Sequence, residues 1–265
     1  MNSREFKCSR LLTDLVENEG VIGIKTSFED EGATFIEVMR LKEICNNSNT
    51  KLTLKIGGPE AIRDMVDSTN IGVKGLVGPM VESAFGLKKY ITAINNNIPE
   101  SVVSSLNLYV NIETIGGVND MHNISNQPEF EQLHGVTVGR VDLVGSLDQD
   151  RKHIDSDEMY TLVKKVFTKV KEKGLKACMG GAVSINSLDF LKKLYAEGLL
   201  DKFETRYVIF DPSITLKNLS RALAKAQEFE YEWLVCKSEA HQILADRESK
   251  RIKMIQDRLS QSISF

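Results

Sequence analysis

Residues 108–113, Leu-Tyr-Val-Asn-Ile-Glu, are the stretch of sequence that decides the fold. Apolar and polar side chains alternate along it, so a β-strand here carries its leucine, valine and isoleucine on one face and Tyr109, Asn111 and Glu113 on the other. We expect the apolar face to pack against helices and the polar face to point into the interior of a barrel. A segment with helical periodicity follows, and this pair of patterns recurs along the chain.

Seven short apolar runs rich in β-branched residues precede longer segments in which apolar residues recur every three or four positions. These runs are residues 21–24, 52–56, 75–77, 108–112, 135–138, 175–179 and 207–210. Strands that are separated by helices lie parallel, because a crossover of that length returns the chain to the same edge of the sheet.

Seven such units in an unbroken chain favour a closed barrel over an open doubly wound sheet. The nucleotide motifs of the open sheet, G-x-G-x-x-G and G-x-x-x-x-G-K-[ST], are both missing. We therefore predict the α/β class and a single (β/α)8 TIM-type barrel with a long C-terminal helical extension. The eighth strand is either a short segment near the N-terminus that the pattern does not reveal, or the barrel is incomplete.

Composition fits one large folded domain. The chain has 265 residues, of which 42% are hydrophobic and 27% charged, and this excludes collagen-like, disordered and disulfide-scaffold proteins. Its five prolines are scattered singly, and no linker-like tract occurs. We predict a single domain over residues 1–265, with an N-terminal helix in residues 1–20 and C-terminal helices from about residue 216 to 265.

The net charge limits which partners the protein can bind, and the cysteine spacing indicates the cellular compartment. A formal net charge of −3 gives no overall attraction to nucleic acid or to an anionic membrane, and no 18 consecutive residues are apolar. The four cysteines stand far apart with no C-x-x-C pair, which indicates free thiols in a reducing compartment. We expect a cytoplasmic protein.

The C-terminal segment lacks proline and glycine from about Leu216 onward, and Ile252, Ile255 and Leu259 form an apolar stripe at helical spacing. Two interpretations stay open for it. The helix either packs back on its own barrel or docks on another subunit, which would make the protein a homo-oligomer.

Polar side chains at strand ends are candidates for the functional site, because the sites of parallel barrels lie at the C-terminal ends of the strands. Glu113 ends one predicted strand, and Asp142 follows the next one along the chain. With the amide of Asn111 they form an all-oxygen donor set, which suits a hard cation such as Mg2+ or Mn2+.

The same acidic residues also have a purely structural interpretation. Glu113 would then cap the helix that starts near Gly116, and Asp142 would pair with Arg140 or Arg151. Spacing alone does not decide between a metal site and these contacts.

Residues 54–61, 75–84, 111–114 and 139–147 resemble, in order and spacing, the HpcH/HpaI aldolase and citrate lyase β-subunit family. The resemblance extends over about residues 20–225 and implies a barrel of the phosphoenolpyruvate/pyruvate-binding type. It implies that Glu113 and Asp142 bind Mg2+ or Mn2+, and that Asn111 stands where the family often has glutamine.

The resemblance also implies a chemistry. A divalent metal that grips the carboxylate and carbonyl oxygens of pyruvate or oxaloacetate stabilises an enolate when a carbon–carbon bond is made or cut. The turn at Gly139 and Arg140 offers backbone amides to the substrate carboxylate. With Lys55 and Asn111, these residues are the predicted substrate-binding set.

Two departures from the family pattern concern catalysis. The first-strand motif corresponds to residues 27–32, Ser-Phe-Glu-Asp-Glu-Gly, and lacks the histidine of the aldolases. Glu29 and Asp30 are the candidates for its acid/base role. Lys55 occupies the position of the family's arginine and keeps the charge without the bidentate fork. A Schiff base at Lys55 would require a depressed pKa.

These observations predict a divalent-metal-dependent carbon–carbon lyase, aldolase-like, acting on a small 2-oxo acid. Two alternatives stay open. One is a citrate-lyase-like or condensing enzyme that uses a CoA thioester. The other is a catalytically weakened barrel that serves as a binding or assembly subunit.

Overall fold

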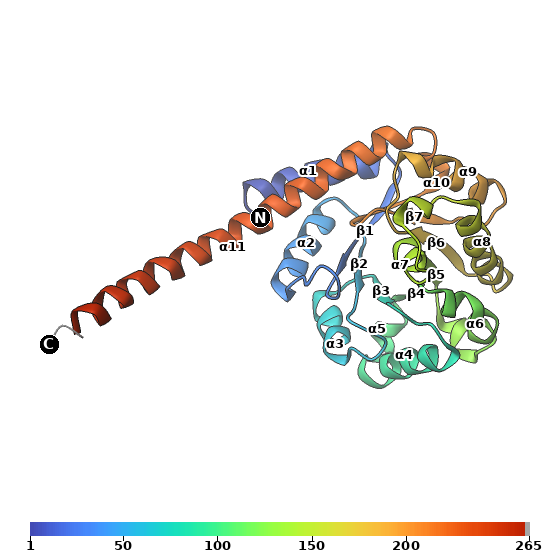
Figure 1. The fold of residues 1–265 in the computed structure, drawn as a ribbon, viewed down its shortest axis with the longest axis horizontal. Helices are drawn as coiled ribbons and strands as arrows, with labels where there is room; N and C mark the ends of the chain where they lie inside the picture. The colour runs from blue at the N-terminus through green and yellow to red at the C-terminus, as the bar shows by residue number, and fades with distance from the viewer. Residues whose placement is uncertain (263–265) are drawn as a thin grey trace.

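The computed structural model describes residues 1–262 and contains a closed barrel in which eight strands lie side by side in sequence order (Figure 1). Helices surround the barrel, and one very long helix extends far beyond it. The predicted fold class, a TIM-type barrel with a C-terminal helical extension, is confirmed.

The strands are β1 (Val21–Ser27), β2 (Leu52–Lys55), β3 (Gly75–Gly78), β4 (Asn107–Ile112), β5 (Gly135–Gly139), β6 (Lys176–Gly180), β7 (Lys202–Glu204) and β8 (Val208–Phe210). The helices are α1 (Ser3–Asn18), α2 (Phe35–Asn47), α3 (Ile62–Ile71), α4 (Ala84–Asn97), α5 (Glu100–Val103), α6 (Ile115–Ser125), α7 (Arg140–Gly145), α8 (Asp157–Glu172), α9 (Leu188–Ala196), α10 (Pro212–Thr215) and α11 (Leu219–Ser262). Short 3-10 turns occupy Pro128–Gln132, Arg151–His153 and Ile185–Ser187.

The prediction that every strand is parallel is wrong for β8. Strands β1 to β7 pair in parallel, whereas β8 lies antiparallel to both β7 and β1 and closes the barrel between them. Only residues 205–207 connect β7 to β8, and this link is too short for a helical crossover. The seventh strand-to-strand connection is therefore a hairpin.

The strand that the sequence pattern missed is β7, which lies near the C-terminal end of the barrel and not near the N-terminus. It has three residues, Lys202, Phe203 and Glu204, of which two are charged. Because Lys202 and Glu204 point into a polar barrel interior, the strand lacks the apolar run that marks the other seven.

The core lies between the sheet and the helices. In α8, for example, Met159, Val163, Val166, Phe167 and Val170 are buried, and their spacing of three and four residues puts them on one helix face. The Ser156 side chain accepts a hydrogen bond from the Met159 N–H and so caps the start of this helix.

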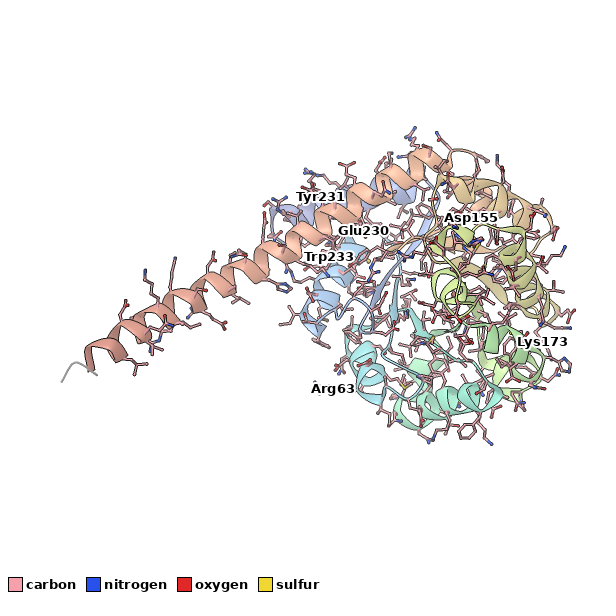
Figure 2. All side chains as sticks on the ribbon, in the orientation of Figure 1. Arg63, Asp155, Lys173, Glu230, Tyr231 and Trp233 are labelled. Atoms are coloured by element: carbon pink, nitrogen blue, oxygen red, sulfur yellow. The ribbon has the colours of Figure 1, made fainter. Side chains whose placement is uncertain are left out.

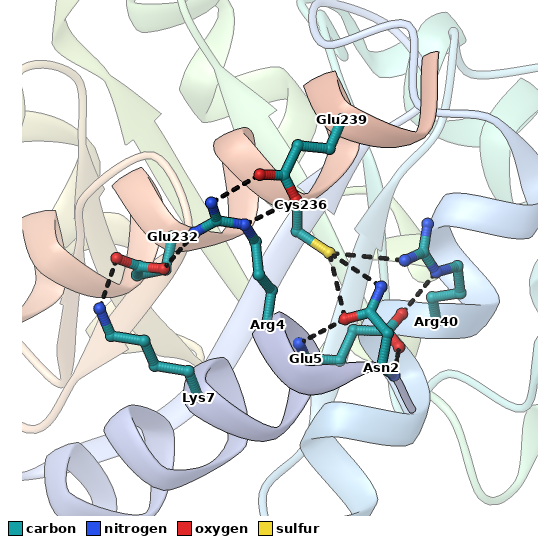
Figure 3. A network of polar contacts seen from close by, with 8 residues as sticks. All are labelled: Asn2, Arg4, Glu5, Lys7, Arg40, Glu232, Cys236 and Glu239. Atoms are coloured by element: carbon teal, nitrogen blue, oxygen red, sulfur yellow. Dashed lines mark hydrogen bonds and ion pairs between the residues drawn. The ribbon is translucent and has the colours of Figure 1, made fainter. Parts of the chain in front are cut away.

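The first part of α11 is joined to α1 by ion pairs along their shared seam (Figure 3). The Arg4 guanidinium donates to both carboxylate oxygens of Glu239 at 2.6 and 2.5 Å. Glu232 accepts from Lys7 at 2.6 Å and from Arg4 at 3.3 Å. Beneath these pairs Trp233 is only 1% exposed, so this part of α11 belongs to the core.

The rest of α11 leaves the body of the molecule, and its side chains stand in open space (Figure 2). Ile252, Ile255 and Leu259, the stripe singled out from the sequence, are 55%, 41% and 56% exposed. The interpretation in which this stripe packs on its own barrel is therefore wrong. Within residues 1–262, no helix is both long enough and apolar enough to span a membrane.

All four cysteines are free thiols, as the sequence predicted, and the structure shows that all four are buried. Burial raises the pKa of Cys8 and of Cys45 to about 12, which keeps both groups protonated near neutral pH.

Trp233→Ala should lower the free energy of unfolding by about 3–5 kcal/mol, because it leaves a cavity in the hydrophobic core. The neighbouring residue Leu234 is 44% exposed, and Leu234→Ala should change stability by less than about 0.5 kcal/mol. Urea denaturation followed by circular dichroism gives both values. Equal midpoints for the two variants would mean that α11 is not part of the cooperative core.

Candidate functional site

A cavity of about 520 Å³ opens at the C-terminal ends of the strands. Its ionisable lining consists of Lys25, Glu29, Asp30, Glu31, Lys55, Glu113, Asp142, Arg151, Glu204, Arg206 and Glu230. The predicted residues Glu29, Asp30, Lys55, Asn111, Glu113, Gly139 and Asp142 all reach this one cavity. Within residues 1–262, no histidine contributes to its lining.

The carboxylate of Glu113 is buried, with 5% of its side chain exposed. The Asn111 amide donates to its Oε1 at 2.9 Å, and the Met80 N–H lies 3.4 Å from its Oε2. Burial raises the pKa of the Glu113 carboxyl above its ordinary value, and the charge of Asp142 adds to this rise, while Lys55 and Asn111 oppose it.

Glu82, Gly139 and Gly117 fix the position of Glu113, a role that sequence reasoning gave to none of them. The Glu82 carboxylate accepts from the Glu113 backbone N–H at 2.7 Å and from the Thr114 hydroxyl at 3.0 Å. A Cβ at Gly139 would lie 2.6 Å from Glu113 Oε1, so glycine there makes room for the carboxylate. A Cβ at Gly117 would collide with Glu82 in the same way.

The structural alternative for the two acids is wrong. Thr114, not Glu113, caps α6, because its side chain accepts from the Gly117 N–H at 3.2 Å. Among the ion pairs of residues 1–262, none includes Asp142, which is exposed to the cavity in the first turn of α7.

Lys55 bridges two carboxylates at the end of β2. Its Nζ lies 2.7 Å from Glu29 Oε2 and 3.9 Å from Glu113 Oε1. Burial alone would lower the pKa of Lys55, but the charges of Glu113 and Glu29 outweigh it, and the pKa is raised. A Schiff base would require a depressed pKa, and the shift of Lys55 has the opposite direction. Asp30 lies at the rim, 3.3 Å from the Arg206 guanidinium.

The side chain of Arg140 does not reach the cavity. It is fully buried and donates to the carbonyl oxygens of Gly180, Ile154 and Gly181 and to the carboxylate of Asp155. Its Cζ lies 5.0 Å from the centre of the Phe190 ring. Because its guanidinium is buried and hydrogen-bonded within the protein, this side chain does not contact a substrate in the cavity.

The backbone N–H groups at the start of α7, unlike the Arg140 side chain, lie beside the cavity. Gly181 has a left-handed φ of +83°, and a Cβ there would lie 2.6 Å from the Arg140 nitrogen and 2.7 Å from the Val141 nitrogen. Glycine at 181 therefore leaves space directly in front of the first N–H groups of α7. Gly139, Val141, Gly180 and Gly181 line the same side of the cavity.

A second buried ion pair was not foreseen. Lys25 of β1 contacts Glu204 of β7, and both line the cavity. The Cys178 thiol donates to Glu204 at 3.7 Å, and a Cβ at Gly180 would lie 3.1 Å from that carboxylate. The sequence pattern did not indicate this pair, because Lys25 lies within an otherwise apolar strand and Glu204 belongs to the strand that the pattern missed.

The donor set suits a hard divalent cation. The Oδ1 of Asn111 is buried and has no hydrogen-bond partner, although the neighbouring Nδ2 is used. An unpaired oxygen beside one buried carboxylate and one cavity-exposed carboxylate is what Mg2+ or Mn2+ would accept. No group of three or more acidic, histidine or cysteine side chains suited to a metal occurs in residues 1–262, so water or substrate would complete the coordination.

Comparison with solved structures gives the same architecture at low sequence identity. An HpcH/HpaI aldolase from Desulfitobacterium hafniense DCB-2 is 14% identical, with 76% of this chain and 82% of that chain covered and a TM-score of 0.60. An HpcH/HpaI aldolase/citrate lyase family protein from Burkholderia cenocepacia J2315 is 13% identical, with 74% of this chain and 91% of that chain covered and a TM-score of 0.56. The citrate synthase SbnG is 16% identical over 82% and 97%, with a TM-score of 0.57.

These likenesses establish the barrel fold. No curated protein matches the chain by sequence. The model of one family, described as HpcH/HpaI aldolase/citrate lyase, matches residues 46–195, which is more than half of the 265 residues. Strands β2 to β6 and the residues Lys55, Glu113 and Asp142 all lie within that match. The chain belongs to the HpcH/HpaI aldolase/citrate lyase family.

Proposed function

We propose that the protein is a divalent-metal-dependent carbon–carbon lyase, aldolase-like, that acts on a small 2-oxo acid. The observation that carries the proposal is the buried Glu113 carboxylate, which shares a cavity with Asp142 and lies beside the unpartnered oxygen of Asn111. Glu113 and Asp142 would hold Mg2+ or Mn2+. When bound, the cation supplies positive charge that stabilises the enolate of the substrate.

The chain's own groups would bind and orient the substrate. The N–H groups at the start of α7, which have space in front of them because residue 181 is glycine, would donate to a substrate carboxylate. Lys55 supplies a cation beside the 2-oxo group, and its ion pair with Glu29 fixes the ammonium in place. Glu29 and Asp30 at the rim are the candidates for moving a proton. Glu29 is the better placed, since it already contacts Lys55.

A condensing reaction with a CoA thioester is the second enzyme candidate. Arg151 and Arg206 both line the cavity, and they could pair with the phosphates of such a ligand. A third candidate is a binding or assembly subunit with weakened chemistry, which the absence of histidine from the described cavity lining favours.

Glu113→Gln and Asp142→Asn should each weaken Mn2+ binding by more than about 100-fold, because each removes one charge from a two-carboxylate site. Isothermal calorimetry measures this directly. Glu230→Gln is the matched control, since Glu230 lines the same cavity outside the donor set. Unchanged Mn2+ affinity in both ligand variants would refute the site.

The protein with Mn2+ should decarboxylate oxaloacetate, a reaction that breaks the C3–C4 bond, releases CO2 and returns a proton to the pyruvate enolate. Lys55→Arg should keep or raise this rate, and Lys55→Met should lower it by about 100-fold, since it removes the charge beside the carbonyl. Production of pyruvate measures the rate. No decarboxylation above the rate with free Mn2+ would favour the binding subunit, and a lysine adduct trapped with borohydride and pyruvate would contradict the metal mechanism.

We also propose that the protein is a homo-oligomer joined through the projecting part of α11. Its exposed stripe of Ile252, Ile255 and Leu259 has no partner element in the described chain. Burial of each such side chain would contribute about 1.5–3 kcal/mol.

Truncation after Arg247 should lower the mass measured by light scattering, while the α1–α11 seam, which ends at Glu239, stays intact. The full-length variant with Ile252→Ser, Ile255→Ser and Leu259→Ser should dissociate in the same way. A full-length protein that is monomeric at micromolar concentration would contradict this assembly.

A further inference from the structure

The barrel has a second cavity at its opposite end, where the strands begin. It has a volume of about 160 Å³, enough for several water molecules or one small ion. Lys51, Lys74 and Lys202 line it, together with Tyr109, Asn107 and Thr53, and no carboxylate lies among its lining residues. It is therefore a cavity with three positive charges and no acidic group.

In the described part of the chain these lysines form no ion pair with an acidic group. Among the ion pairs of residues 1–262, none includes Lys51, Lys74 or Lys202. Asp201, which directly precedes Lys202, pairs with other lysines: it accepts from Lys171 at 2.7 Å and from Lys176 at 3.1 Å. No ion pair of the described residues therefore compensates the three lysine charges.

The lining is held by the sheet. The Lys51 carbonyl accepts from the Ile24 N–H at 2.8 Å, and the Lys74 N–H donates to the Leu52 carbonyl at 2.9 Å. Both backbones are therefore fixed where β2 and β3 begin. Lys202 comes from β7 and reaches across the barrel, so that its Nζ donates to the Tyr109 hydroxyl at 2.8 Å and lies 4.6 Å from the centre of that ring.

That contact prepares Tyr109 as a donor. Because its oxygen accepts from Lys202, its own hydroxyl proton is free to point into the cavity. The Asn107 amide and the Thr53 hydroxyl add neutral donors. The pKa of the neighbouring His134 is lowered, chiefly by burial and further by the charge of Lys202, which agrees with a positive field at this end.

We propose that this cavity is a binding site for a phosphate group, either free inorganic phosphate or the phosphoryl end of a small phosphomonoester. Three lysines, of which Lys51 and Lys74 are exposed and can turn their ammonium groups toward a ligand, and the Tyr109 hydroxyl match an anion with more than one charge and several acceptor oxygens. A monocarboxylate would leave most of the charge unbalanced.

The site is separate from the cavity at the other end and independent of the proposed lyase function. Tyr109 and Glu113 are four residues apart on the same chain segment, which is about 13 Å along an extended chain. Binding here needs no metal and no turnover, so it can be tested on the metal-free protein.

The test is calorimetric titration of the metal-free protein with inorganic phosphate and, separately, with methyl phosphate, at constant ionic strength set by chloride. The wild type should bind at least one of them, and the ligand that binds identifies the source of the phosphate group. The double variant Lys51→Gln, Lys74→Gln should bind it at least about 100-fold more weakly, since each lost charged hydrogen bond costs about tenfold or more.

The matched control is Lys88→Gln, Lys217→Gln, which removes two exposed lysines that line neither cavity and so changes net charge equally. It should bind phosphate like the wild type, and thermal unfolding should show that both double variants are folded. No binding of either ligand up to about 10 mM would overturn the proposal. So would equal binding by the Lys51/Lys74 variant, which would place the anion elsewhere, for instance beside Lys55.

Discussion

The buried carboxylate of Glu113 is the constraint on which the rest of the site depends. Removing such an ion from water costs several kcal/mol unless neighbours compensate for it. The chain compensates only in part, with the Asn111 amide at 2.9 Å, the Met80 N–H at 3.4 Å and Lys55 at 3.9 Å. The remaining deficit of positive charge is the physical reason to expect a cation here, and Gly139 supplies the space in which the carboxylate can lie.

The barrel carries opposite electrostatic arrangements at its two ends. At the C-terminal ends of the strands, acids and bases line one cavity, and charge is partly neutralised within the Lys25–Glu204 and Lys55–Glu29 pairs. At the other end Lys51, Lys74 and Lys202 stand together without acids. A net charge of −3 conceals this separation, since it averages over both ends. The polar interior that produces both cavities also explains why β7 lacks an apolar signature.

Helix α11 has two parts with different surroundings, one packed on the barrel and one projecting from it. Its first part is tied to α1 through Glu232 and Glu239 and buries Trp233, so it completes the coat of the barrel. Leu223, Gln227 and Glu230 from the same part also line the cavity at the C-terminal ends of the strands. The helix then continues without interruption into open space, which leaves its apolar stripe available to another molecule.

The sequence by itself determined the barrel class, seven of the strands and the meeting of Glu113, Asp142 and Asn111 at one end, because hydrophobic periodicity fixes which way side chains point and parallel strands end at the same rim. Lys55 was added to this set by the resemblance to the family. Only the tertiary structure decided the rest. Arg140 and Asp142 are two residues apart, yet a helix turns about 100° per residue, so α7 sends one into the core and the other into the cavity. Closure of the barrel likewise forms the contacts of Lys25 with Glu204 and of Lys202 with Tyr109. A local sequence pattern does not predict such contacts, because the residues of each pair are more than ninety positions apart.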